Sequence, residues 1–248
     1  MASNYESGHA KNVANLGKLI SSCSGYGEAY NPGNASLTIS SLNTLLENAE
    51  NSVNAVNAAI PGQKNAIAAR RVAFNKMSDI ASRIVNALKS SGVNDLTLDN
   101  ASSLLRKIRG RRSSALHTEE EKKALAAEGK ETKQVSASQT SFDNRLDNFD
   151  KLIKLAVSVP QYTPNEAELS SQGLEAFLSD LKTKNAAVVE ATTSLNNSRM
   201  ARNGLLYSKG SGLVDTAMAV KAYVKSAFGA GDPRYRQISK LSFKGYKV

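Results

Sequence analysis

Two short basic segments carry the side chains best suited to chemistry with a partner. Residues 106–112 hold five cations within seven positions: Arg106, Lys107, Arg109, Arg111 and Arg112. A second set lies further along the chain: Arg234, Arg236, Lys240 and Lys244. Aromatic residues, Tyr235 and Phe243 among them, are interleaved with this second set. Because cations can hold phosphates and aromatic rings can stack on bases, both segments are candidate nucleic-acid-binding sites.

A purely structural interpretation of the same segments stays open. Arginine and lysine can pack their aliphatic stems on a helical bundle, or cap the C-terminal ends of helices. The net charge of +10 does not decide between the two, because it favours polyanionic partners and also keeps a helical protein soluble. The residues around Ile238, Leu241 and Phe243 form either a last short helix or a docked extended segment.

The other reactive residue types are too few or too scattered for a recognisable active site. His9 and His117 are the only histidines, and neither has a second ligand at a typical metal-site spacing. Cys23 is the only cysteine, which excludes an intrachain disulfide or a metal site built on several cysteines of one chain. The glycine-rich residues 208–212 lack Walker spacing, and no Gly-x-Ser-x-Gly motif occurs. We therefore expect no enzyme, no metal and no cofactor.

The elements that position these residues are predicted to be helices. The chain is 41% hydrophobic but only 6% aromatic, which suits closely packed helices better than a β-sandwich. Apolar residues recur at helical spacing, and no window alternates apolar and polar residues over several positions. The first stripe of each half consists of Val13, Leu16, Leu19 and Ile20, and of Phe142, Leu146, Phe149, Ile153 and Ala156. The pattern predicts an all-α fold of elongated or bundled antiparallel helices.

The chain also repeats itself. Tyr30 and Pro32 recur as Tyr162 and Pro164, a displacement of 132 residues, and collinear matches extend along both halves. The displacement changes only within loop-like stretches, as expected after duplication of a folded block. We predict two pseudo-symmetric three-helix units with about six main helices. Residues 1–115 form one unit with a basic tail, 116–134 a connecting helix or linker of acidic and basic residues, and 135–248 the second unit with its tail.

Local signals refine these units. Each Tyr-x-Pro motif is predicted to start the second helix of its unit, with Asn31 or Thr163 as the cap. The Pro61–Gly62 pair is predicted to end that helix in the first copy. In the second copy, residues 208–212 are predicted to split the third helix.

Residues 4–12 (NYESGHAKN), the two Tyr-x-Pro motifs and residues 223–229 (YVKSAFG) resemble uncharacterised all-helical proteins of Bacteroidota bacteria. The resemblance spans nearly the whole chain. It implies a bacterial origin and an internally duplicated helical fold. No activity is assigned to that family, so the resemblance implies nothing about chemistry.

Three functions are compatible with these features. The first is a non-enzymatic structural or interaction protein, a scaffold or self-assembling homo-oligomer, because repeated faces favour assembly or multivalent binding. The second is nucleic-acid binding through the basic segments. The third, a membrane-acting helical protein, requires an apolar segment, and no stretch approaches the ~18 apolar residues of a membrane span. The polar residues up to Lys11 carry no secretion signal, so we expect a cytoplasmic protein.

Overall fold

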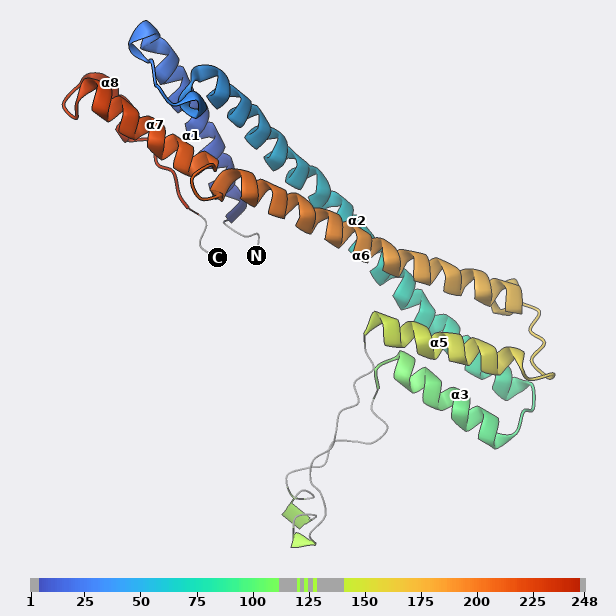
Figure 1. Cartoon of the computed structure of the whole chain (residues 1–248). Coiled ribbons are helices and arrows are strands. Elements are labelled where there is room, and N and C mark those ends of the chain that lie inside the picture. The colour runs from blue at the N-terminus through green and yellow to red at the C-terminus, as the bar shows by residue number, and fades with distance from the viewer. Residues whose placement is uncertain (1–4, 112–119, 121–122, 125–126, 129–140, 246–248) are drawn as a thin grey trace. The chain divides into compact units, whose positions relative to one another are not determined.

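The structure is a computed structural model that describes residues 5–111, 120, 123–124, 127–128 and 141–245. Within these residues every regular element is a helix, so the predicted all-α fold is confirmed (Figure 1). Three 3₁₀ helices, η1 (Gly27–Ala29), η2 (Ala35–Leu37) and η3 (Ala167–Leu169), lie in the loops before the two longest helices. The described α-helices are α1 (Tyr5–Gly25), α2 (Ile39–Ser90), α3 (Asp95–Ile108), α5 (Phe142–Val157), α6 (Ser171–Tyr207), α7 (Leu213–Phe228) and α8 (Pro233–Ser239).

The chain divides into two compact units, each assembled from both copies of the repeat. Unit 1 comprises Met1–Lys64 and Glu190–Val248, and unit 2 comprises Asn65–Val189. Unit 1 therefore joins the beginning of the first copy to the end of the second, and unit 2 joins the end of the first copy to the beginning of the second. These units do not coincide with the ranges 1–115 and 135–248. Most of the predicted connecting segment, 116–134, lies outside the described residues.

The units combine parts of both copies because α2 does not end at Pro61 and Gly62 but continues through them for a total of 52 residues. Its residues up to Lys64 belong to unit 1, and the rest belong to unit 2. The predicted helix end at this pair is therefore wrong. An interior proline removes one backbone donor and destabilises a helix by ~3 kcal/mol or more. Packing on either side offsets that penalty, since Val56 and Phe74 are both almost fully buried.

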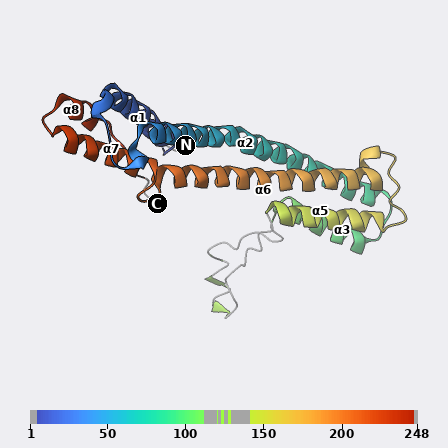
Figure 2. The ribbon, with the colours of Figure 1, turned by 45° about the horizontal axis from the view of Figure 1, so that its top comes forward.

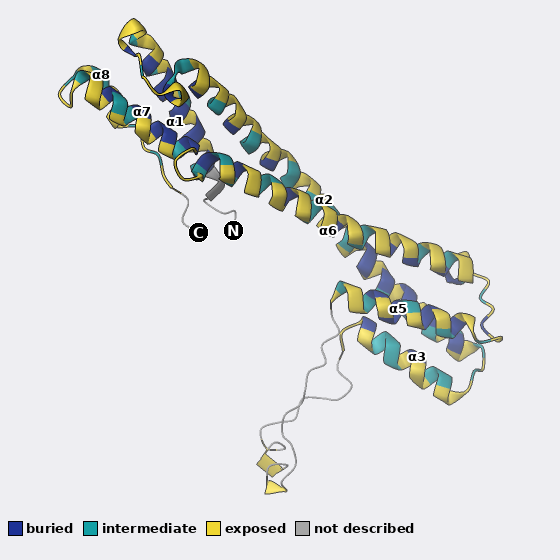
Figure 3. Ribbon diagram, in the orientation of Figure 1, coloured by how far each residue is buried: buried dark blue, intermediate teal, exposed yellow. Residues whose placement is uncertain are grey.

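The core of unit 1 contains the first of the predicted apolar stripes. Val13, Leu16, Leu19 and Ile20 of α1 are all buried, and dark blue residues recur along α1 and α7 in Figure 3. Complete burial of a side chain of this size contributes roughly 1.5–3 kcal/mol. The other helices of the unit add Leu42, Leu206, Val220, Val224 and Ile238 to the same cluster.

The core of unit 2 is built around α5, whose predicted stripe also packs inward. Leu146, Phe149, Ile153 and Ala156 are buried, and Phe142 is partly buried against them. Phe149 meets the ring of Phe177 edge-on, with centroids 5.9 Å apart. The other helices of the unit add Phe74, Met77, Ile80, Ile84, Leu88, Ala101, Ile108, Leu174 and Leu181.

The two long helices begin later than the Tyr-x-Pro motifs predict. Asn31 and Thr163 do not cap them, because a 3₁₀ turn intervenes before α2 and before α6. The caps are Thr38 and Ser170. The Thr38 hydroxyl accepts from the N–H three residues later at 3.4 Å, and the Ser170 hydroxyl accepts from the N–H of Gly173 at 3.1 Å. Residues 35–37 and 167–169, which the sequence pattern assigns to the starts of the two helices, form these 3₁₀ turns instead.

The tyrosines of the two motifs hold these loops in the same way. The hydroxyl of Tyr30 donates to the carbonyl of Leu37 at 2.7 Å, and that of Tyr162 donates to the carbonyl of Leu169 at 3.0 Å. Both bonds are buried, and desolvation raises the pKa of both phenols, that of Tyr162 to about 12. The matched loops of the two copies therefore fold alike.

The predicted break at residues 208–212 is confirmed, since α6 ends at Tyr207 and α7 begins at Leu213. Gly210 has a φ of +80°, and its N–H donates to the carboxylate of Asp215 at 2.7 Å. A Cβ on Gly212 would lie 2.6 Å from the backbone nitrogen of Ser208. The sharp turn therefore depends on glycine at both positions.

Candidate functional site

The first basic segment lies at the C-terminal end of α3, a helix that the sequence pattern did not predict. Asn94 caps the start of α3, because its side chain accepts from the N–H of Thr97 at 2.9 Å. The helix runs beside α5 in both views of the chain (Figures 1 and 2). Ala101 and Ile108 of α3 are fully buried in the core of unit 2. Residues 106–111 thus form the end of a packed helix and its cap rather than a free tail.

Backbone donors satisfy most of the last carbonyl groups of α3. Gly110, with a φ of +67°, adopts the left-handed conformation that commonly ends a helix. Its N–H donates to the carbonyl of Lys107 at 3.0 Å, and the N–H of Arg111 donates to the carbonyl of Arg106 at 2.9 Å. The N–H of Arg109 donates one turn back at 3.0 Å. The guanidinium groups of Arg109 and Arg111 are therefore not needed to cap the helix.

The final carbonyl of α3 is bound by Arg145, which α5 supplies. Its Nε donates to the carbonyl of Ile108 at 2.9 Å. One terminal nitrogen donates to the carbonyl of Phe74 and to the hydroxyl oxygen of Ser78, each at 3.2 Å. Desolvation by burial lowers the pKa of Arg145. Arg145 therefore links α2, α3 and α5 where the basic segment ends.

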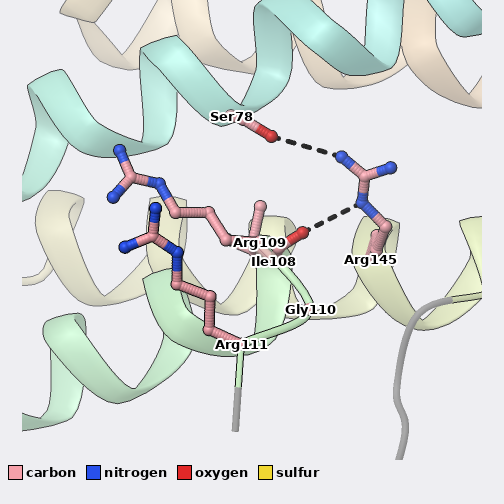
Figure 4. Close-up of a pocket in the computed structure, with 6 residues that line it drawn as sticks. All are labelled: Ser78, Ile108, Arg109, Gly110, Arg111 and Arg145. Carbon is pink, nitrogen blue, oxygen red and sulfur yellow. Dashed lines mark hydrogen bonds between the residues drawn. The ribbon is translucent and has the colours of Figure 1, made fainter.

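These residues surround a pocket of about 370 Å³ within unit 2 (Figure 4). In the close-up, Arg109 and Arg111 extend in the same direction from the end of α3, and Arg145 stands on the other side of Ile108 with its guanidinium directed toward Ser78. The guanidinium of Arg109 also donates to the hydroxyl of Ser82. The described residues that line the pocket are Ser78, Ile108, Arg109, Gly110, Arg111 and Arg145, of which three are cationic and none is acidic.

The remaining predicted cations of this segment lie outside the pocket lining. Arg106 is half-buried and donates to the hydroxyl of Ser103 at 3.2 Å, and Lys107 is exposed. Arg112 lies outside the described residues. Arg109 and Arg111 are thus the two predicted site residues that the fold brings together in one pocket.

In the second basic segment, which lies in unit 1, Arg234 is already paired within the chain. Arg234 donates to both carboxylate oxygens of Asp232, at 3.0 and 2.8 Å, and its guanidinium lies 3.7 Å from the ring centroid of Phe228. The side-chain and backbone hydrogen bonds from Arg234 hold the pKa of Asp232 down at about 2. Arg236 and Lys240 are exposed. The charge of Arg234 is therefore already compensated within the chain.

Residues 241–245 follow α8 as an irregular segment bound to α1 and α7 (Figure 1). The side chain of Asn12 donates to the carbonyl of Lys244 at 2.9 Å and accepts from its N–H at 3.1 Å. Asn15 donates to the carbonyl of Ser242 at 2.8 Å. Lys221 of α7 donates to the carbonyl of Leu241 at 2.5 Å. Both predicted alternatives are thus present in succession, a short helix and then a docked segment.

Sequence reasoning missed Arg145, although the repeat held a signal for it. Asn15 matches Asn148 at a displacement of 133, and the same displacement places Asn12 opposite Arg145. Arg145 also lies three residues after Phe142, within the apolar stripe of α5. A cation on that face of a helix requires a partner in the core, and here the partners are carbonyl and hydroxyl oxygens.

Other candidate chemistry finds less support in the described residues. Cys23 is fully buried, and desolvation raises the pKa of its thiol to about 12, so it stays protonated near neutral pH. In the described part of the chain, no three His, Cys, Asp or Glu side chains gather closely enough to hold a metal ion. None of the described helices contains a stretch long and apolar enough to cross a membrane.

Comparison of the chain with protein families, with curated proteins and with solved structures gave no match.

Proposed function

We propose that the protein is a non-enzymatic helical interaction protein that binds an anionic partner through the end of α3 in unit 2. The supporting observation is the pair Arg109 and Arg111. Both are exposed, and the carbonyls that they could cap are satisfied by backbone N–H groups and by Arg145. In the described residues, neither forms an ion pair with a carboxylate. Two cations that the helix does not require are available to a partner.

The overall charge bears on what that partner is. At a formal net charge of +10, two copies of this chain repel each other at long range. The same charge attracts an acidic molecule and accelerates its association. We therefore place an acidic partner ahead of self-assembly, and light scattering at several concentrations tests that order directly.

The experiment uses polyglutamate as a defined anionic probe and measures its binding to three forms of the full chain at low salt. The test variant is R109Q/R111Q. The control is R236Q/K240Q, which removes the same amount of charge from exposed positions at the end of α8. We expect binding to weaken at least about tenfold in the test variant and to change little in the control. Equal losses in both variants would show that net charge alone is responsible and would refute the proposed site.

A second candidate function is nucleic-acid binding, favoured by the position of Arg106 and Lys107 on the same last turn of α3. A row of cations suits the regular spacing of phosphates. If the protein binds nucleic acid, its affinity for a labelled duplex falls as the salt concentration rises. A plot of the logarithm of the binding constant against the logarithm of the salt concentration then has a slope of about −0.9 per phosphate contact. The R109Q/R111Q variant then loses about two units of that slope. Polyglutamate binding without salt-sensitive duplex binding would exclude this second function.

A further inference from the structure

The pocket at the end of α3 presents hydrogen-bond donors almost exclusively. Its side-chain lining consists of three guanidinium groups, one hydroxyl and one aliphatic residue. The Ser78 oxygen accepts from Arg145, which leaves the hydroxyl hydrogen of Ser78 free to donate. The carbonyl of Ile108 is occupied by the Nε of Arg145. A ligand that complements this lining must be an acceptor and must carry negative charge.

The donors exceed what the protein itself uses. A guanidinium has five N–H groups. Arg109 uses one terminal nitrogen on the hydroxyl of Ser82, and Arg145 uses its Nε and one terminal nitrogen. Burial lowers the pKa of Arg145, because its charge is partly removed from water. An anion in the pocket would compensate that charge.

The corresponding place in unit 1 shows how the chain otherwise fills it. There the position of Arg145 is taken by Asn12, whose amide pairs with both backbone groups of Lys244. The repeat places Ile238 at the position of Ile108, and both side chains are fully buried. The chain that follows Ile238 thus binds to its own unit. In unit 2 an arginine replaces the asparagine, and a cationic pocket is present.

We propose that the pocket formed by Ser78, Arg109, Arg111 and Arg145 binds a phosphate group, either as the free ion or as a phosphate monoester. The inference rests on the proposed function, because it names the chemical group through which the partner would be recognised. A phosphate monoester near neutral pH carries about 1.5 to 2 negative charges and offers three acceptor oxygens around one centre. Arginine forks bind such oxygens in pairs, which lysine cannot do. A volume of about 370 Å³ leaves room for the group that carries the phosphate.

The test is a calorimetric titration of the full chain with inorganic phosphate at constant ionic strength, set by chloride. R109Q/R111Q is the test variant, since the backbone pattern that ends α3 does not use these side chains. R71Q is a matched control for one charge, because Arg71 is an exposed arginine of the same unit outside the pocket lining. R236Q/K240Q controls for the loss of two.

We expect saturable binding of one phosphate per chain, weakened at least about tenfold in R109Q/R111Q and unchanged in both controls. An equal loss in R236Q/K240Q, or the absence of saturable binding to the unaltered chain, would overturn the inference. Circular dichroism of each variant verifies that the helices are intact, so a folding defect is not mistaken for a lost site.

A parallel titration with phosphoserine separates the two sources of the group. Tighter binding of phosphoserine assigns the pocket to a phosphate monoester, and tighter binding of inorganic phosphate assigns it to the free ion. The result is also separable from the test of the proposed function. If polyglutamate binding depends on Arg109 and Arg111 while phosphate does not saturate, only the phosphate inference fails. If phosphate binds and polyglutamate does not, the pocket stands and the broader function falls.

Discussion

Unit 1 and unit 2 differ at the matched ends of α8 and α3. In unit 1 the segment after α8 binds back to the unit through Asn12, which pairs with the backbone of Lys244. In unit 2 the matched position is Arg145, which binds the last carbonyl of α3 beside a pocket lined by further arginines. Both residues at this repeated position hold backbone groups of their own unit, but only in unit 2 does the position also line a pocket of cationic donors.

Elsewhere the two units are closely alike. The buried bonds from Tyr30 to Leu37 and from Tyr162 to Leu169 are 132 residues apart and have nearly the same length. The matched α1 and α5 each place an apolar stripe in the core of their unit. The comparison therefore predicts equal responses where the units agree and unequal ones where they differ.

The largest effect is expected at the matched core positions Leu16 and Phe149, both of which are fully buried. Phe149→Ala should lower the free energy of unfolding by about 4 kcal/mol and Leu16→Ala by about 3 kcal/mol, because each leaves a cavity. Urea denaturation followed by circular dichroism measures both losses. A loss below about 1 kcal/mol at either position would show that its helix does not pack as described.

Smaller changes in the free energy of unfolding, opposite in sign to each other, are expected for alanine substitutions at two glycines of α6. A Cβ on Gly173 would lie 2.1 Å from the carbonyl oxygen of Ala167, whereas a Cβ on Gly204 would meet nothing within 4 Å. Gly173→Ala should therefore destabilise the protein by about 2 kcal/mol. Gly204→Ala should stabilise it by about 0.5–1 kcal/mol through the better helix propensity of alanine. Thermal and urea unfolding measure the change in stability of both variants. A change of the same sign in both would contradict the prediction.

The next effect tests the likeness of the two loops. Tyr30→Phe and Tyr162→Phe each remove one buried hydroxyl donor and leave the carbonyl of Leu37 or Leu169 without it. Each change should cost about 1–2 kcal/mol of unfolding free energy, and the two losses should agree within error. A difference of more than about 1 kcal/mol between the two losses would show that the two hydrogen bonds contribute unequally to stability, despite their common geometry.

The smallest effect concerns the caps of α8 and α3, which are Asp232 in unit 1 and Asn94 in unit 2. The hydrogen bonds from Arg234 lower the pKa of Asp232 from 3.8 to about 2. The ionised carboxylate therefore stabilises the fold above pH 3.8, and this contribution is lost as the pH falls toward 2.

Unfolding of D232N and of the unaltered chain at a series of acidic pH values should show this dependence only in the latter. The cap of α3 has no such group, so N94S provides a control whose acid response matches that of the unaltered chain. If the stability of D232N and of the unaltered chain depended on acidic pH in the same way, the ion pair between Asp232 and Arg234 would not be the source of that dependence.

The sequence was sufficient for the helical stripes, because burial of residues such as Leu16 and Phe149 follows from spacing alone. The break after Tyr207 was also predictable, since glycines and short polar residues cluster there. The continuation of α2 through Pro61 was not, because packing on both sides outweighs the local penalty of proline. The repeat could not show that each unit combines helices from both copies. Because matched helices carry similar apolar stripes, a helix could pack equally well on a partner from its own copy or from the other copy.

Only part of the candidate site could be predicted from the sequence. Arg109 and Arg111 follow from the density of charge, which needs no knowledge of the fold. Arg145 reaches the same pocket from a different helix, and only the matched position in the repeat singles it out. Conversely, Arg234 counts as a free cation in the sequence, yet Asp232 neutralises it two residues away. Charge density alone does not distinguish available cations from compensated ones.

The division of the chain between the units also orders events during synthesis. Unit 2 is one uninterrupted stretch, Asn65–Val189, whereas unit 1 needs Glu190–Val248 to join Met1–Lys64. During translation, every residue of unit 2 has been made before Val220 and Ile238, which belong to the core of unit 1. The apolar stripe of α1 therefore lacks its partners from α7 and α8 until that later part of the chain has been made.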